Sequence, residues 1–440
     1  MTTRRDKPAP KPPAKPPAAA KVTSKPKAAP VSERALAPAT PATPATPVKK
    51  APTRRAPVKG NPSTPPKAKP STPPKAKPVA TPSEVATTEA AATTEAATTP
   101  VEATPMEAAP SVAGRRRIWL SGATGFVGTA VARQLRTRGD EVVAPVRDRR
   151  RAEELLDMGV TVIEDDLSDV DRMAETMKDV DAAIHAAGSY RVGITRQERG
   201  AMWDANIGTT TRFLDAAEAA KASRIVYVST VGIFGNTKGQ VVDESYRRNI
   251  RDGFLSWYDE TKFGAHEVVL QRVRTGAPII SVLPSQVYGP GDHSALGEQL
   301  ALAHAGKLPY RALDGVGLGF VHVDDLAAGI VAALDRGAVG RSYILSGPRH
   351  RLRDAMAIAA GLGGKRLPFL SIPDRVLRVL APAGRFVGQA NMREVVDAGA
   401  GVTYWASNDR AVEELDWRPR DLEDGLRDTF EALADRAYTR

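Results

Sequence analysis

The chain contains no cysteine, and its first aromatic side chain is Trp119. The absence of cysteine excludes disulfides and thiolate metal sites. No apolar run approaches the roughly 18–20 residues that a membrane-spanning helix needs. The N-terminal stretch MTTRRDKPAPK is basic but has no apolar core, so we expect no secretory signal. These absences predict a cytoplasmic protein without a metal site.

Residues 1–114 differ in composition from the rest of the chain. Residues 1–110 hold 25 of the 35 prolines, and the octapeptide STPPKAKP occurs twice in succession, at Ser63–Pro70 and Ser71–Pro78. A segment with so few large apolar side chains cannot bury enough surface to offset the entropy of ordering. We therefore predict that residues 1–114 form a long disordered tail.

The positive charge of the chain belongs to this tail. Residues 1–110 carry 18 of the 62 Lys+Arg and 7 of the 51 Asp+Glu, so the remainder carries 44 of each and is neutral. A basic tail is suited to weak contact with nucleic-acid phosphates or an anionic membrane. The alternative is an extended, solubilising tether. We favour the tether, because the tail has no aromatic residue that would stack on bases.

From Arg115 onward, short apolar runs alternate with amphipathic stretches. This alternation predicts an α/β fold with a Rossmann-type, doubly wound parallel sheet. The near-continuous apolar character of the runs is typical of buried parallel strands, although Pro145 is a local misfit in the second one. The predicted strands cover residues 117–121, 141–146, 160–166, 181–188, 224–230 and 278–284, and the predicted helices cover 127–139, 150–159, 169–180, 200–220 and 257–275.

We divide the chain into the tail (1–114), a dinucleotide-binding core with the catalytic residues (115–288), and a C-terminal part (289–440). The C-terminal part is expected to complete the sheet and to form a smaller substrate-binding lobe. Within it, Ile372–Gly388 is apolar and basic on a helical period. We favour a lobe helix that packs over the substrate site, with contact to a membrane surface as the alternative.

Three glycines, Gly122, Gly125 and Gly128, lie between the first predicted strand and the first predicted helix. In that context, the spacing predicts a tight turn, close approach of a pyrophosphate to the backbone, and close packing of helix on strand. The free N–H groups and the dipole of the helix N-terminus then favour the phosphates. We expect Thr124, Phe126 and Val127 in the same loop to contact the dinucleotide as well.

The end of the second strand distinguishes NADP from NAD. NAD-binding proteins usually place an acid there to hold the ribose 2′-hydroxyl. This chain has Val146 followed by Arg147, and an arginine suits a 2′-phosphate, so we expect NADP in preference to NAD. The alternative is that Arg147 belongs only to the solvated basic run RDRRR.

Two further strand ends are predicted to face the cofactor. Asp166 and Leu167 follow the third strand. Asp166 is in position to bind the adenine amino group, and the alternative is a helix-capping role for the acids near it. The small residues Ala186, Ala187 and Gly188 follow the fourth strand and leave room for the cofactor. We interpret His185, just before them, as a packed core histidine.

Tyr258 and Lys262 lie four residues apart on a predicted helix, hence on one face of it. Thr230 ends the fifth strand, and ligands bind at the carboxyl ends of parallel strands. Hydride transfer to a carbonyl requires a proton for the new hydroxyl. A tyrosine whose pKa of about 10 is lowered by the Lys262 ammonium and the nicotinamide would act as general acid in reduction and general base in oxidation. Thr230, or Ser229 beside it, would bind the same substrate oxygen.

These motifs, in their order, resemble those of the extended short-chain dehydrogenase/reductase family, also called the NAD-dependent epimerase/dehydratase family. The resemblance runs from about Arg115 to the C-terminus, and it is carried by GATGFVG, VRD, EDDL, HAAG, DANIGTT, VYVSTVGIFG, YDETK, LPSQVYGPGD and HVDDLAAGI. Within the family, the motifs are most similar to those of dihydroflavonol reductases, hydroxysteroid dehydrogenases and hopanoid-associated sugar epimerases.

The resemblance implies that Thr230, Tyr258 and Lys262 are the catalytic residues. It further implies that Asn206 supports the lysine through water, that Pro284 begins a loop beside the nicotinamide, and that Asp325 is a structural cap. Tyr258 and Lys262 would also contact the cofactor. Relatives of this kind are often homodimers, so a homodimer is implied as well.

The leading hypothesis is therefore an NADP- or NAD-dependent oxidoreductase that acts on a secondary alcohol or ketone of a lipid-like or polyphenol-like small molecule. One alternative is an NAD-dependent sugar-nucleotide epimerase or dehydratase. Another is a non-catalytic, cofactor-sensing module whose basic tail binds nucleic acid or membrane. The predicted substrate-facing loops, Ser189–Gly200 and Asn236–Ser256, carry Tyr190, Arg191, Arg196, Tyr246 and Arg247, which suit an acidic or a flat ligand.

Overall fold

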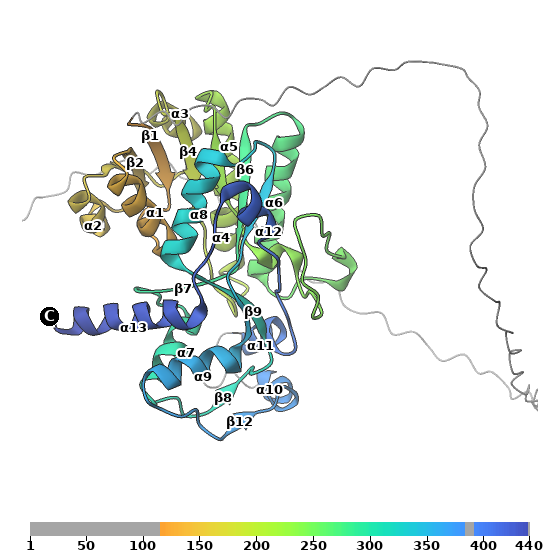
Figure 1. Ribbon diagram of the computed structural model, residues 1–440. Helices are drawn as coiled ribbons and strands as arrows, with labels where there is room; N and C mark the ends of the chain where they lie inside the picture. Colours follow the sequence, from red (N-terminus) through yellow and green to blue (C-terminus); the bar gives the residue numbers. More distant parts are fainter. Residues whose placement is uncertain (1–114, 383–390, 439–440) are drawn as a thin grey trace, which may run out of the picture. The chain divides into compact units, whose positions relative to one another are not determined.

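The computed structural model describes residues 115–382 and 391–438. Seven strands form one fully parallel sheet in the order β10-β6-β5-β4-β1-β2-β3 (Figure 1). The order reverses between β1 and β4, and this reversal is the place where open α/β sheets bind ligands. The strands are β1 (Arg117–Ser121), β2 (Glu141–Val146), β3 (Thr161–Glu164), β4 (Ala182–His185), β5 (Ile225–Val228), β6 (Ile279–Pro284) and β10 (Ser342–Leu345).

Helices cover both faces of this sheet because successive strand side chains point to opposite faces. Ile118 and Leu120 of β1 belong to the core under α1 (Phe126–Thr137) and α8 (Val323–Arg336). Trp119 between them belongs to the second core, under α3 (Val170–Thr176), α5 (Thr209–Ala219) and α6 (Trp257–Arg274). The doubly wound sheet expected from the sequence is confirmed.

A smaller cluster of elements has its own apolar core, which includes Tyr288, Phe320 and Met356. Its helices are α7 (Ala295–His304), α9 (Leu352–Leu362), α10 (Asp374–Leu380), α11 (Met392–Gly399) and α13 (Leu422–Tyr438). Its strands are β7 (Gln286–Tyr288), β9 (Gly317–His322) and β11 (Arg349–Arg351) in one sheet, and β8 (Arg311–Ala312) with β12 (Ser371–Ile372) in another. Residues after 288 thus form most of this lobe. They also supply β10, the edge strand of the large sheet, and α8, which packs on one face of that sheet.

Several local predictions need adjustment. The helix expected over 150–159 is only the short α2 (Glu153–Asp157), preceded by a 3-10 turn at Arg149–Arg151. The helix expected over 200–220 begins as α4 (Arg199–Trp203) and continues as α5, with a π-helical turn at Asp204–Gly208 between them. Two 3-10 turns, Val231–Phe234 and Ile250–Asp252, and helix α12 (Asp409–Leu415) complete the elements.

Pro145 fits into β2 because the pairing of β2 with β1 ends at Val143, before the proline. The disordered tail predicted for residues 1–114 lies outside the described residues. Within residues 115–382 and 391–438, no helix has the length and apolar character needed to cross a bilayer.

The lobe helix predicted over Ile372–Gly388 is present in the described part as α10, which packs against α11; its position over the substrate site stays a prediction. Helix α10 has no buried residue, and only Leu377 contributes to a core, against Val396 of α11. Val379 and Leu380 are exposed to solvent. Residues 383–388 of the predicted segment lie outside the described residues.

Candidate active site

The glycine loop forms the turn from β1 into α1. Gly122 has φ of +72°, and a Cβ there would lie 2.7 Å from the backbone of Ala186 at the end of β4. A Cβ on Gly128 would lie only 2.0 Å from the Gly122 carbonyl oxygen, while Gly125 caps the helix without a side chain. Only glycine therefore permits this approach of helix to strand. Thr124 and Gly125 are exposed, and Phe126 and Val127 are half-buried, around the N-terminus of α1.

Basic and acidic side chains follow the next two strands. Arg147 is exposed directly after β2, whereas Arg150 pairs with Asp148, whose Oδ1 lies 3.0 Å from the Arg150 Nε. After β3, the exposed Asp166 accepts a hydrogen bond from the Ser168 N–H at 3.0 Å. Asp169, not Asp166, caps α3. Leu167 is buried with φ of +64°.

The end of β4 is lined by small residues, as predicted. Ala186 and Ala187 are half-buried and Gly188 is exposed, so they leave space beside the glycine loop. His185 is fully buried, with its Nδ1 2.8 Å from the Ser121 hydroxyl and its ring stacked on Phe213. Burial and nearby Lys262 lower the pKa of His185 to about 3. It is a neutral core histidine.

Thr230 and Tyr258 come together at the carboxyl end of the sheet. Thr230 follows β5, and its hydroxyl accepts a hydrogen bond from the Gly232 N–H at 3.1 Å. The Thr230 hydroxyl lies within hydrogen-bonding reach of the Tyr258 phenol. The neighbouring Ser229 instead directs its hydroxyl to Nδ1 of His266, 3.1 Å away. Thr230, and not Ser229, is thus the hydroxyl beside Tyr258.

Lys262 is buried one turn after Tyr258 on α6. Its Nζ donates a hydrogen bond to the Val228 carbonyl at 3.2 Å and lies 5.5 Å from the centre of the Tyr227 ring. A Cβ on Gly188 would lie 4.0 Å from the same Nζ. The ammonium therefore lies beneath the small residues that follow β4.

Asn206 is the buried residue at the middle of the π-helical turn. Its side chain accepts a hydrogen bond from the Ser189 N–H at 2.8 Å and donates to the Ser189 carbonyl at 3.1 Å and to Thr261 at 2.9 Å. Asn206 thus ties the loop after β4 to the turn of α6 between Tyr258 and Lys262. Single π turns inside helices are frequent at functional sites.

The electrostatics differ from the prediction. Burial raises the pKa of Tyr258 above its usual value, and neighbouring Tyr190 adds to the rise. Burial lowers the pKa of Lys262 to about 8. The expectation that the lysine holds the tyrosine pKa low is therefore not met by the protein groups alone. In the protein itself, Tyr258 is a neutral phenol at pH 7, which is the state of a proton donor.

One buried ion pair next to Tyr258 was not predicted from the sequence. The Arg248 guanidinium binds both carboxylate oxygens of Asp259, at 2.7 and 3.2 Å, and both side chains are buried. Arg248 also stacks over Phe254 at 4.6 Å and donates to the Gly253 carbonyl at 2.8 Å. Asp259 directly follows Tyr258, so this pair fixes the loop 236–256 against the start of α6. No spacing rule connects positions 248 and 259, and Arg248 is one of two adjacent arginines in a polar loop.

The predicted substrate-facing residues separate into two groups. The Tyr190 ring meets the Tyr258 ring edge-on, with centroids 4.7 Å apart. Arg191 pairs with Glu198, and Arg196 is exposed.

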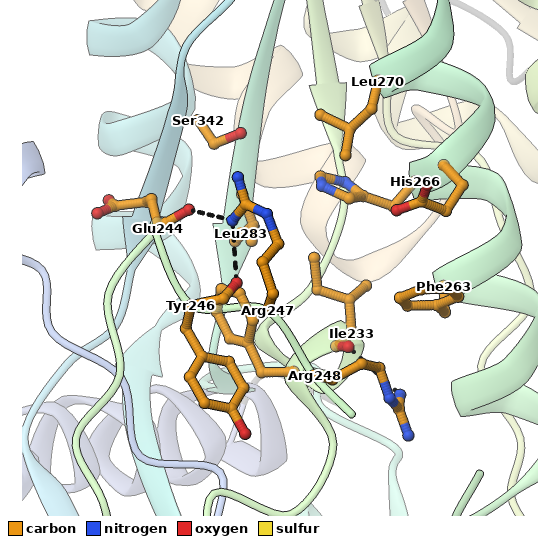
Figure 2. A pocket seen from close by; sticks show the side chains of 12 residues that line it. Ile233, Glu244, Tyr246, Arg247, Arg248, Phe263, His266, Leu270, Leu283 and Ser342 are labelled. Carbon is orange, nitrogen blue, oxygen red and sulfur yellow. Dashed lines mark hydrogen bonds between the residues drawn. The ribbon is translucent and has the colours of Figure 1, made fainter. Parts of the chain in front are cut away.

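Tyr246 and Arg247 lie elsewhere. They line a small cavity of about 70 Å³ between the 236–256 loop, α6 and β6 (Figure 2). His266, whose other neighbour is Ser229, lies on the wall of that cavity. Of the five predicted residues, Tyr190 is the one whose ring contacts Tyr258.

The resemblance also implied roles for Pro284 and Asp325, which lie outside this cluster. Pro284 is buried at the end of β6, paired with Leu345. The Asp325 carboxylate accepts hydrogen bonds from the Arg420 side chain, the shortest at 2.7 Å, and its carbonyl accepts one from Trp417. Asp325 therefore holds the segment before α13 through Arg420, whereas the residue that caps α8 is His322 and not Asp325.

A model of the NAD-dependent epimerase/dehydratase family matches residues 118–346, just over half of the chain. The chain belongs to that family. Other members are similar along most of their length. A Synechocystis protein named after dihydroflavonol 4-reductase is 28% identical over 337 residues, which cover 73% of this chain and 96% of the relative. Sterol demethylase protein B of Methylococcus capsulatus is 27% identical over 60% of this chain and 79% of its own.

Solved structures show the same fold. The crystal structure of gox2253 has a TM-score of 0.64 and 29% identity, and the match covers 73% of this chain and 99% of that one. A UDP-glucose-4-epimerase from Stenotrophomonas maltophila, solved with NAD and formylated UDP-arabinopyranose, has a TM-score of 0.60 and 22% identity. The match covers 74% of this chain and 100% of that one. The second likeness shows the Rossmann fold only.

The residues of this family member fit a nicotinamide dinucleotide. The Cβ-free cradle of Gly122, Gly125 and Gly128 opens at the N-terminus of α1, where N–H groups and the helix dipole favour a pyrophosphate. The small residues after β4 and the buried ammonium of Lys262 lie farther along the same sheet edge. The chain is an NAD-dependent enzyme of the oxidoreductase, epimerase and dehydratase type.

Proposed function

We propose that this family member is an NADP-preferring oxidoreductase that interconverts a ketone and a secondary alcohol on a lipid-like or polyphenol-like small molecule. The observation that carries the proposal is the meeting of Thr230 and Tyr258 above a buried Lys262 at the carboxyl ends of β4 and β5. The family match supports the reaction class but leaves the net reaction open.

In this mechanism the bound dinucleotide supplies or accepts the hydride. The Thr230 hydroxyl binds the substrate oxygen. Tyr258 gives its proton to that oxygen in reduction, and takes it back in oxidation. The Lys262 ammonium, one helical turn away, stabilises the phenolate that proton donation leaves behind. Asn206 ties the loop after β4 to α6, and this contact holds the catalytic side chains on α6 at a fixed distance from that loop.

The substrate class is inferred from the surroundings of Tyr258. Its edge-on neighbour Tyr190 has 56% of its surface exposed, and therefore offers a flat apolar face beside the reacting position. Tyr404, which lies near Tyr190 and Tyr258, adds an aromatic ring whose hydroxyl is already bonded to the Ala398 carbonyl. Relatives whose names refer to a flavonoid, a sterol and a farnesylated quinoline also support a large, mostly apolar substrate.

The cofactor preference rests on Arg147. It follows β2 at the position where an acid would bind a ribose 2′-hydroxyl, and it forms no ion pair with another described residue. An arginine that is free to make a bidentate contact favours a 2′-phosphate.

Steady-state turnover with NADPH and with NADH, over a panel of flavanonols, ketosteroids and long-chain β-keto esters, tests the proposal. We expect turnover with at least one ketone, and a loss of about 10²–10⁴-fold in kcat for Tyr258→Phe. Tyr246→Phe is the matched control, because Tyr246 lines the separate cavity of Figure 2, and it is expected to keep full turnover. Full turnover of Tyr258→Phe would falsify the mechanism.

The sugar-nucleotide alternative has a distinct signature. An epimerase or dehydratase retains its dinucleotide through the cycle and consumes none. Purified protein that carries tightly bound NAD, turns over a dTDP- or UDP-sugar and oxidises no NADPH with any ketone would replace the oxidoreductase assignment. The role of Tyr258 would survive that outcome.

A further inference from the structure

The end of the lobe carries a concentration of exposed apolar side chains. Six of the fourteen large hydrophobic residues that are exposed in the described part of the chain lie here. We call them the distal patch: Tyr310, Phe369, Leu370, Val376, Val379 and Leu380. Scattered exposed apolar residues are normal, but contiguous ones mark an interaction surface.

The backbone brings the first half of the distal patch together. Strands β8 and β12 run parallel with Arg311 opposite Ser371, and the Arg311 N–H donates to the Leu370 carbonyl at 2.9 Å. Tyr310 and Leu370, which precede the two strands, are therefore neighbours. Phe369 beside them makes no apolar contact that shields it, since its exposed fraction is 102%.

Helix α10 supplies the second half. Leu377 packs inward against α11, so Val376, Val379 and Leu380 are left on the outer side, with 43%, 78% and 57% of their surfaces exposed. The chain runs from Leu370 through two strand residues and Pro373 directly into this helix. Figure 1 shows β12 and α10 at the end of the lobe remote from the seven-stranded sheet. The distal patch is thus separate from the catalytic residues at the sheet edge.

The charges around the distal patch indicate what covers it. Between residues 365 and 380 the chain has Lys365, Arg366, Arg375 and Arg378, all exposed, and a single acid, Asp374. None of the four cations forms an ion pair with another described residue; Arg378 donates only to the Ala400 carbonyl, at 2.9 Å. Apolar side chains rimmed by unpaired Lys and Arg suit an anionic bilayer surface, where each basic residue contributes about 1 kcal/mol.

A second copy of the chain suits this surface less well. In a two-fold dimer the same patch meets itself, so the four cations of each copy would face those of the other. Like charges in such a contact repel. We therefore propose that the distal patch docks the enzyme on the surface of an anionic membrane, with Phe369 and the exposed residues of α10 entering the headgroup region.

The absence of cysteine makes a direct test available. In the full-length chain, Phe369→Cys and Val379→Cys each place one label site in the distal patch. Val339→Cys, at a residue 50% exposed between α8 and β10, is the matched control. Each protein carries an environment-sensitive NBD label and is mixed with vesicles of phosphatidylcholine containing 30–40% phosphatidylglycerol, or of phosphatidylcholine alone.

We expect the NBD emission at positions 369 and 379 to shift to the blue and rise several-fold with anionic vesicles, and to change much less with neutral ones. Position 339 should not respond. Vesicle binding without any response at 369 and 379 would assign it to the basic N-terminal tail and overturn the proposal. A blue-shifted label at 369 before vesicles are added, which would mean that the chain or a second copy covers the patch, would overturn it too.

The affinity of the protein for anionic vesicles provides a second test of the proposal. Phe369→Ser in the full-length chain should weaken binding to anionic vesicles by about tenfold or more, since a buried Phe contributes about 1.5–3 kcal/mol. Val339→Ser should leave it unchanged. Equal affinities for Phe369→Ser and the unaltered protein would contradict the docking surface. Melting temperatures of the two variants control for folding.

Discussion

The nucleotide half of the molecule and the substrate half are built in different ways. Around α1 and β4 the surface is main chain and small residues, and its shape follows from glycines that permit no Cβ. Around Tyr258 the surface is made by side chains from distant segments, held by the Arg248–Asp259 pair and by Asn206. A backbone cradle can be predicted from residue spacing. A surface assembled from side chains depends on contacts that spacing does not encode.

The largest effect is expected from placing a side chain in the backbone cradle. Gly128→Val would bring Cβ to 2.0 Å from the Gly122 carbonyl, so helix and strand must separate. We expect dinucleotide affinity, measured by calorimetry, to fall more than about 100-fold. Gly361→Ala in α9 is the contrasting change, because nothing lies within 4 Å of its Cβ. It should preserve affinity and stabilise the lobe by about 0.4–1 kcal/mol.

Removal of Arg248 tests the side-chain half. Arg248→Met leaves the Asp259 carboxylate buried without its partner. We expect the free energy of unfolding to fall by about 3–5 kcal/mol, and kcat to fall with little change in dinucleotide affinity. The double variant Arg248→Met/Asp259→Asn should regain part of both losses, since the unpaired charge is gone. If the double variant is no better than the single one in urea denaturation, the pair does not act as a unit.

A substitution of Arg147 tests which part of the nucleotide half distinguishes NADPH from NADH. Arg147→Ser should raise the KM for NADPH about tenfold and leave the KM for NADH unchanged, since it removes one charge-assisted contact to a 2′-phosphate. Arg150→Ser, whose side chain is engaged by Asp148, is the control. An equal change for both cofactors after Arg147→Ser would mean that the arginine does not read the 2′ position.

The smallest effect concerns pH. Burial lowers the pKa of His266 to about 4, from an ordinary value of 6.5. Between these values the unfolded chain binds a proton that the folded protein does not, so stability falls as pH falls. His266→Gln should remove about 1.4 kcal/mol per pH unit of that slope, measured by urea denaturation at pH 6.5 and 5.

The same contrast explains what the sequence could predict. The parallel sheet, the glycine cradle and the fact that His185 is a core residue follow from local patterns, and the structure has all three. The choice of Thr230 over Ser229 required the position of His266, which lies 37 residues from Ser229 on another element. The raised pKa of Tyr258 required knowledge of how deeply its ring is enclosed. Arg247 and Tyr246 were expected at the substrate, but the fold directs them into a different cavity.

The π-helical turn at Asp204–Gly208 has a consequence for how this protein tolerates change in length. A residue in an α-helix is turned by about 100° from the one before it. If one residue ahead of Asn206 were deleted, for instance Met202, α5 could keep its place only if the π turn became an α turn. The Asn206 side-chain amide would then rotate out of reach of Ser189 and Thr261. The exact chain length ahead of Asn206 is therefore part of what holds these two segments together.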